Sequence, residues 1–307
     1  DWSSDVCSSD LVRVCNRLAR ARGIRLTFAG YGGGYGTAYQ KSELYRCGYQ
    51  GQVFLNRRPW PEGEVYQCRG LESSQGRQYG SCLCSEGLAA AKVAEMRRFA
   101  EIIEPGFMYI HDIDSGTWAA SEQSWRLRCD ECRRRWPSDE LTDPQGMAGA
   151  LAHWFGFVAR HLRQVRTDDY DAARDLTLIF VSPLYGAAHE SDETWQQEIA
   201  CFRLISELIG PVPGVQFGFR EQFLNADRSP RLAQLAAALD AVGHGHGAHV
   251  IAFSGGDNYT SDDLCNLSGG LSPLYQGAQS VCLSNGGVHE EPVQVLNAEC
   301  LWNAGEP

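Results

Sequence analysis

The sequence lacks any apolar run of the roughly 20 residues that a helix needs to span a bilayer, and it lacks an excess of positive charge. Its 27 Lys and Arg are outnumbered by 38 Asp and Glu, and the net charge at pH 7 is −11. Phosphate binding needs clustered cations, so this balance argues against nucleic acid. We interpret the basic run Arg133–Arg135 as a solvated helix face. We therefore expect neither a membrane nor a nucleic acid as partner.

A dinucleotide-binding fingerprint is also missing. The Gly-rich segment Gly30–Gly36 follows a predicted strand, but it lacks the GxGxxG spacing and leads into a loop rather than a helix. A doubly wound open sheet is the alternative fold, and this absence argues against its nucleotide-binding form. The sequence predicts no cofactor.

The first eleven residues, DWSSDVCSSDL, are rich in Ser and Asp and lack an amphipathic period. They resemble translated sequencing-adapter sequence, so we exclude residues 1–11 from the fold and expect the native N-terminus to be missing. On this interpretation, the presence of a signal peptide stays open. The cellular compartment, export included, and the oligomeric state stay open too.

The chain has 12 cysteines, which is many for a cytosolic enzyme of this size. Several lie in Gly-rich or polar segments, where disulfides would suit an exported protein. Cys82 and Cys84, with Cys129 and Cys132, form CxC and CxxC pairs that could instead bind a structural zinc ion. We predict no metal site, and we leave disulfides, this weaker zinc alternative and free thiols open.

Strand-like and helical segments alternate along most of the chain, which is typical of parallel β/α units. We expect six strands, at Ile24–Ala29, Phe107–Ile113, Leu176–Ser182, Val215–Arg220, His249–Ser254 and Val293–Ala298. We expect helices at Val12–Arg22, Gly87–Ile103, Met147–Val165, Thr194–Ile209, Arg231–Ala241 and Pro273–Gln279.

These elements predict an α/β fold, a (β/α)8 TIM barrel that occupies residues 12–307 and lacks its N-terminal strand or strands. A long loop insertion is expected at about residues 37–78, with one hairpin strand near Val53–Leu55. We interpret His244-Gly245-His246 as a flexible loop, because it has no carboxylate at metal-ligand spacing.

Polar and acidic residues follow each predicted strand, where the active site of such a barrel lies. Asp112, Asp114 and Glu221 are the candidate catalytic carboxylates. The candidate substrate-binding residues are His111, Tyr185, Arg220, Asp257, Asn297, Glu299 and Trp302. Each also has a structural explanation, as a helix cap, an Arg partner or an ordinary core residue.

Strand alternation places Met108, Ile110, Asp112 and Asp114 on one face, which we expect to point into the barrel. Two neighbouring acids push their pKa values apart, giving one ionised group and one proton donor. Glycoside hydrolysis needs that division of labour. The strand ends therefore predict a glycosidase with a carbohydrate substrate.

The helix Gly87–Ile103 and the strand ending in HDID resemble glycoside hydrolase family 20, the β-N-acetylhexosaminidases, over about residues 80–165. The segment from Trp125 to Cys132 is similar too, and HDID also resembles the paired aspartates of family 84. The resemblance implies an exo-acting, retaining, substrate-assisted mechanism, in which one carboxylate orients the substrate's acetamido group and another protonates the leaving oxygen. This chain departs from family 20 because it has no Asp-Glu pair after His111, so the resemblance does not assign those roles between Asp112 and Asp114.

Two other function classes stay open. One is a non-catalytic carbohydrate-binding barrel, which the irregular carboxylate pattern would suit. The other is a zinc-dependent hydrolase that uses Cys or His ligands. Sugar binding without turnover would identify the first, and bound zinc the second.

Overall fold

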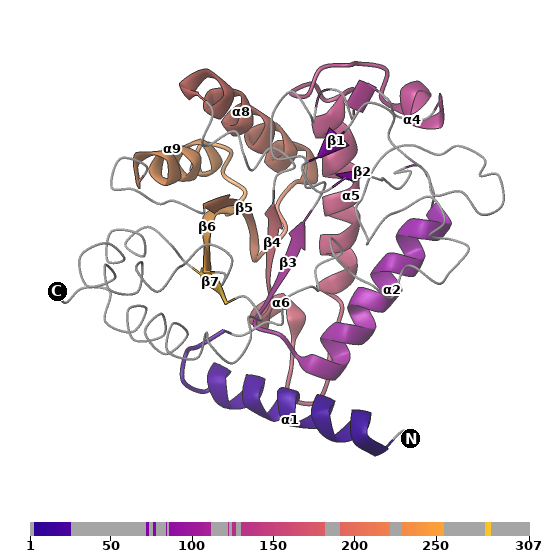
Figure 1. Ribbon diagram of the computed structural model, residues 1–307, viewed down its shortest axis with the longest axis vertical. Coiled ribbons are helices and arrows are strands. Elements are labelled where there is room, and N and C mark those ends of the chain that lie inside the picture. The colour runs from indigo at the N-terminus through magenta and orange to yellow at the C-terminus, as the bar shows by residue number, and fades with distance from the viewer. Residues whose placement is uncertain are drawn as a thin grey trace.

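The computed structural model describes residues 3–25, 72–73, 76–77, 84, 86–111, 122, 125–126, 130–181, 191–221, 229–254 and 280–283. Within these ranges the chain is a mixed α/β protein built on a parallel sheet (Figure 1). Its strands are β3 (Phe107–His111), β4 (Thr177–Val181), β5 (Val215–Glu221), β6 (Gly247–Ser254) and β7 (Ser280–Leu283). Its helices are α1 (Ser3–Arg20), α2 (Glu86–Ile103), α4 (Asp130–Arg135), α5 (Met147–Leu162), α6 (Ala172–Asp175), α8 (Asp192–Ile209) and α9 (Ser229–Asp240).

The five strands of the sheet are hydrogen-bonded in chain order, and every neighbouring pair is parallel. The predicted α/β class and the strands near 107, 176, 215 and 249 are confirmed, each within a few residues of its expected bounds. β4 is buried along its whole length, as its continuous apolar sequence predicts.

Several predicted elements differ from those observed. β7 was missed, and α5 ends at Leu162 rather than at Val165. Ile24 and Arg25 have no strand structure, while the rest of the strand expected there lies outside the described residues. A short antiparallel hairpin, β1 (Glu72–Ser73) and β2 (Gly76–Arg77), lies in the predicted loop insertion.

Three other predicted elements lie outside the described residues: the strand near Val53–Leu55, the helix Pro273–Gln279 and the strand Val293–Ala298. The helix α1 begins at Ser3, inside the segment that the sequence led us to exclude. Among its described side chains, Arg13, Asn16, Arg17 and Arg20 form hydrogen bonds to the body of the protein.

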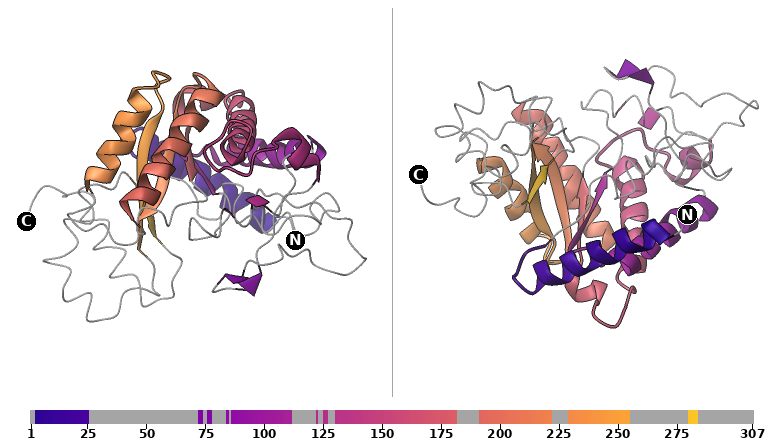
Figure 2. Two further views of the ribbon diagram at one scale, coloured as in Figure 1. Left: turned by 90° about the horizontal axis from the view of Figure 1, so that it is seen from above. Right: turned by 60° about the horizontal axis from the view of Figure 1, so that its bottom comes forward.

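Four helices pack in a row along one side of the sheet, in the order α2, α5, α8, α9 (Figure 2). Local sequence explains their ends. At the start of α8, Ser191 and Thr194 form a reciprocal capping box, and its end is Gly210, whose φ of 75° is unfavourable for residues with a side chain. The helices α5, α8 and α9 connect β3 to β4, β4 to β5 and β5 to β6, and all three lie in this one layer.

The sheet face beneath these helices is apolar, and we call it the helix face. Phe180 of β4 stacks on Phe155 of α5 with ring centroids 4.3 Å apart, and Phe217 of β5 lies 5.4 Å from Phe202 of α8. The helix face consists of Met108, Ile110, Leu178, Phe180, Val215, Phe217 and Ala248. Burying a large apolar side chain of this kind is worth about 1.5–3 kcal/mol. This packing therefore determines which face of the sheet the helices cover.

An ionic network joins α1 to the amino ends of the strands. The Glu104 carboxylate is fully buried and accepts hydrogen bonds from Arg17, Arg20 and Thr167. Arg20 also lies over the Tyr170 ring, whose hydroxyl donates to the carbonyl oxygen of Pro105. Burial raises the pKa of Glu104, but these hydrogen bonds outweigh it and lower the pKa to about 2.

Two further buried groups lie at the amino ends of the strands, which we call the amino edge. The Arg163 guanidinium donates to the carbonyl oxygens of Ala172, Leu176 and Gly214, which joins the turns that precede β4 and β5. His246, predicted to lie in a flexible loop, is instead buried next to the start of β6 and is hydrogen-bonded through Nδ1 to the Ser206 hydroxyl at 2.8 Å. The amino edge is thus held by buried polar contacts.

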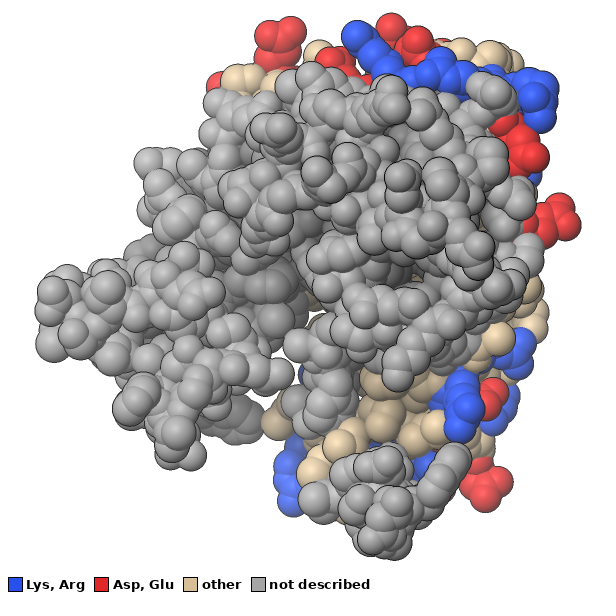
Figure 3. All heavy atoms as spheres, turned by 45° about the vertical axis from the view of Figure 1, so that its right-hand side comes forward, with Lys and Arg blue, Asp and Glu red and all other residues tan. Residues whose placement is uncertain are grey.

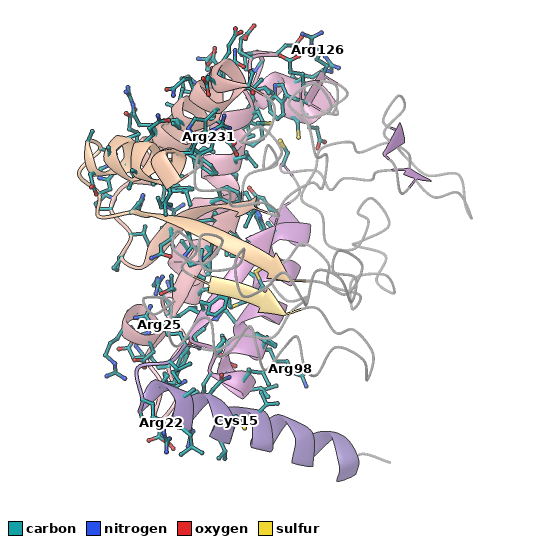
Figure 4. The ribbon with its side chains drawn as sticks, turned by 60° about the vertical axis from the view of Figure 1, so that its left-hand side comes forward. Cys15, Arg22, Arg25, Arg98, Arg126 and Arg231 are labelled. Atoms are coloured by element: carbon teal, nitrogen blue, oxygen red, sulfur yellow. The ribbon has the colours of Figure 1, made fainter. Side chains whose placement is uncertain are left out.

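The basic run of α4 lies at the end of the molecule away from α1. Arg133, Arg134 and Arg135 are exposed, which confirms the predicted solvated face. In Figure 3, basic side chains (blue) and acidic side chains (red) lie next to one another at the top of the view. Figure 4 shows Arg126 at the α4 end of the molecule, with Arg22 and Cys15 at the α1 end. Among the described helices, none has the length and apolar character needed to cross a membrane.

Removing the Glu104 carboxylate is expected to destabilise the protein strongly. Glu104→Ala leaves Arg17 and Arg20 facing a buried gap, and breaking a buried pair costs about 3–5 kcal/mol. Asp169→Asn is the matched control, because it removes the exposed partner of the same Arg17 and should cost less than about 1 kcal/mol. Urea unfolding of both variants measures the difference, and equal losses would contradict the importance of Glu104.

Candidate functional site

The carboxyl ends of the five parallel strands lie at one edge of the sheet, which we call the carboxyl edge. His111 is the last residue of β3, and Arg220 and Glu221 are the last two of β5. The sheet therefore brings these three predicted site residues to the same edge. Adjacent strands are about 4.8 Å apart, so the ends of β3 and β5 are separated by about 10 Å across the sheet.

The register defines the rows of this edge. His111 pairs with Val181, Val181 with Gly218, and Gly218 with His249, so these four residues form one row. Glu221 lies three residues beyond Gly218, which is about 10 Å along the strand, and it pairs with Ala252 of β6. Within the described residues, β5 and β6 thus continue past the row of His111.

The other predicted site residues follow the strands in the chain but lie outside the described residues. Asp112 comes directly after β3, and Asp257 comes three residues after β6. Asp114, Tyr185, Asn297, Glu299 and Trp302 are also outside the described ranges. Their placement at the site therefore stays a prediction.

The expected orientation of β3 is wrong. We expected Met108 and Ile110 to point into the barrel, but both belong to the core cluster that contains Val93, Met96 and Ala100 of α2. Tyr109 and His111, which alternate with them along β3, pair with Ile179 and Val181 of β4. Ile179 and Val181 are buried but lie outside that cluster. The alternation of side chains along the strand could not show which face points towards the helices, because both faces of these strands are apolar.

The face away from the helices, which we call the second face, carries polar groups between apolar ones. It contains Ile179, Val181, Gln216, Gly218 and His249. His249 is buried, and its Nδ1 is 2.7 Å from Oε1 of Gln216. Burial lowers the pKa of His249 to about 4, so this imidazole is neutral at pH 7.

Gly218 and Gly247 leave room for larger neighbours on the second face. A Cβ at Gly218 would lie 2.8 Å from Cγ2 of Ile179, and a Cβ at Gly247 would lie 3.4 Å from Cγ of Gln216. Small residues therefore alternate with large ones across the strands, as they do inside small closed sheets. Sequence reasoning did not bring Gln216 and His249 together, because it considered only the strand ends.

The cysteine pairs are described only in part. Cys84 packs against the hydrophobic core and Cys132 lies within it, whereas Cys82 and Cys129 lie outside the described residues. Within the described ranges, no three His, Cys, Asp or Glu residues are placed to hold a metal ion. The zinc hypothesis for the four cysteines stays untested.

Comparisons with family models, with curated proteins and with solved structures find no match to this chain. The fold and the geometry of the carboxyl edge therefore carry the functional argument.

Acidification is expected to destabilise the protein between pH 6.5 and pH 4. Burial lowers the pKa of both His246 and His249 to about 4, with the neighbouring His244 adding to the effect at His246. Their stabilising contribution is complete above the unfolded value of 6.5 and is lost as the pH falls towards 4, at about 2–3 kcal/mol for each.

Urea midpoints measured from pH 7 to pH 4 test this expectation. The double variant His246→Gln, His249→Gln should be less stable at pH 7 but should lose less stability across that range. An equal decline in both proteins would show that other groups govern it.

Proposed function

We propose that the chain is a glycoside hydrolase of the β-N-acetylhexosaminidase type, and that its sheet is part of a (β/α)8 barrel. The observation that carries the proposal is that the five strands are parallel and lie in chain order. Their carboxyl ends therefore share one edge, and the acidic segments follow these ends in the chain. A doubly wound sheet would reverse its strand order and cover both faces with helices. Here the connecting helices share one side of the sheet, as the outer helices of a barrel do.

The two edges of the sheet differ in a way that supports this assignment. The amino edge is held by Glu104, Arg163 and His246, whose polar groups are used in buried contacts within the protein. The carboxyl edge ends in His111 and in Arg220-Glu221. Active sites of parallel barrels lie at the carboxyl edge.

The proposed chemistry uses the carboxylates that follow β3 in the chain and the one at the end of β5. In the proposed reaction, one of Asp112 and Asp114 orients the substrate's acetamido oxygen, which attacks the anomeric carbon while the glycosidic bond breaks. The other donates its proton to the leaving oxygen, and water then opens the cyclic intermediate with retention of configuration. Glu221 is a further candidate carboxylate from the other side of the edge, and Arg220 a candidate for binding the sugar.

The substitutions Asp112→Asn and Asp114→Asn test this function. Each is expected to lower kcat for release of a chromogenic N-acetyl-β-glucosaminide by at least about 100-fold, because proton transfer or nucleophile orientation is lost. The unfolding midpoint should change little. Asp240→Asn is the matched control, since Asp240 is an exposed carboxylate at the end of α9.

Full activity in both aspartate variants would remove this mechanism. Saturable sugar binding by the wild-type protein without turnover on a panel of glycosides would favour the carbohydrate-binding alternative. Loss of activity in Asp240→Asn as well would mean that the effect is not specific to the carboxyl edge.

A further inference from the structure

We draw no further inference here: the strongest candidate, the exposed apolar face that Val14 and Leu18 form on the outside of α1, carries none because nothing in the described part of the chain shows what covers it.

Discussion

Burial of one sheet face beneath a row of four helices is the constraint on which the rest of the structure depends. The aromatic contacts from Phe155 through Phe180 and Phe217 to Phe202 join α5, β4, β5 and α8. Once these rings are buried, strand alternation leaves Ile179, Gln216 and His249 on the second face. Because all five strands are parallel, their carboxyl ends then share one edge. The helix packing therefore determines which face of the sheet the helices cover, and the parallel order determines where the strands end.

The buried charges lie at the amino edge, where they make contacts within the protein, and the proposed site lies at the carboxyl edge. Glu104 accepts hydrogen bonds from two arginines of α1, and Arg163 donates to three carbonyl oxygens at the amino edge. These groups are buried in contacts within the fold, so substituting them should change stability rather than catalysis. The neutral pair Gln216 and His249 lies elsewhere, within the sheet and on its second face.

The sequence predicted the parts of the fold that local patterns specify. The continuous apolar run at Leu176–Ser182 is typical of a buried parallel strand, and β4 is one. β7 was missed because four residues between Ser- and Gly-rich segments carry too weak a pattern. The face of β3 was assigned wrongly because alternation cannot distinguish two apolar faces. The Glu104 network could not be predicted either, since its arginines are 84 and 87 residues away in the chain.

Of the predicted site residues, the structure describes only three at the strand ends, and their roles stay predictions. Chain order and parallel pairing bring His111, Arg220 and Glu221 to one edge, which the alternation of strand and helix segments predicts. The roles of Asp112 and Asp114 depend on side-chain geometry beyond β3, and local sequence does not specify it. Gln216 and His249 needed the register of three strands to be recognised.

A crystal structure of the protein with N-acetylglucosamine tests the central claim most directly. The account predicts electron density for the sugar at the carboxyl edge, over the ends of β3 and β5. Density for the sugar against the outer helices or at the amino edge near Glu104 would contradict it.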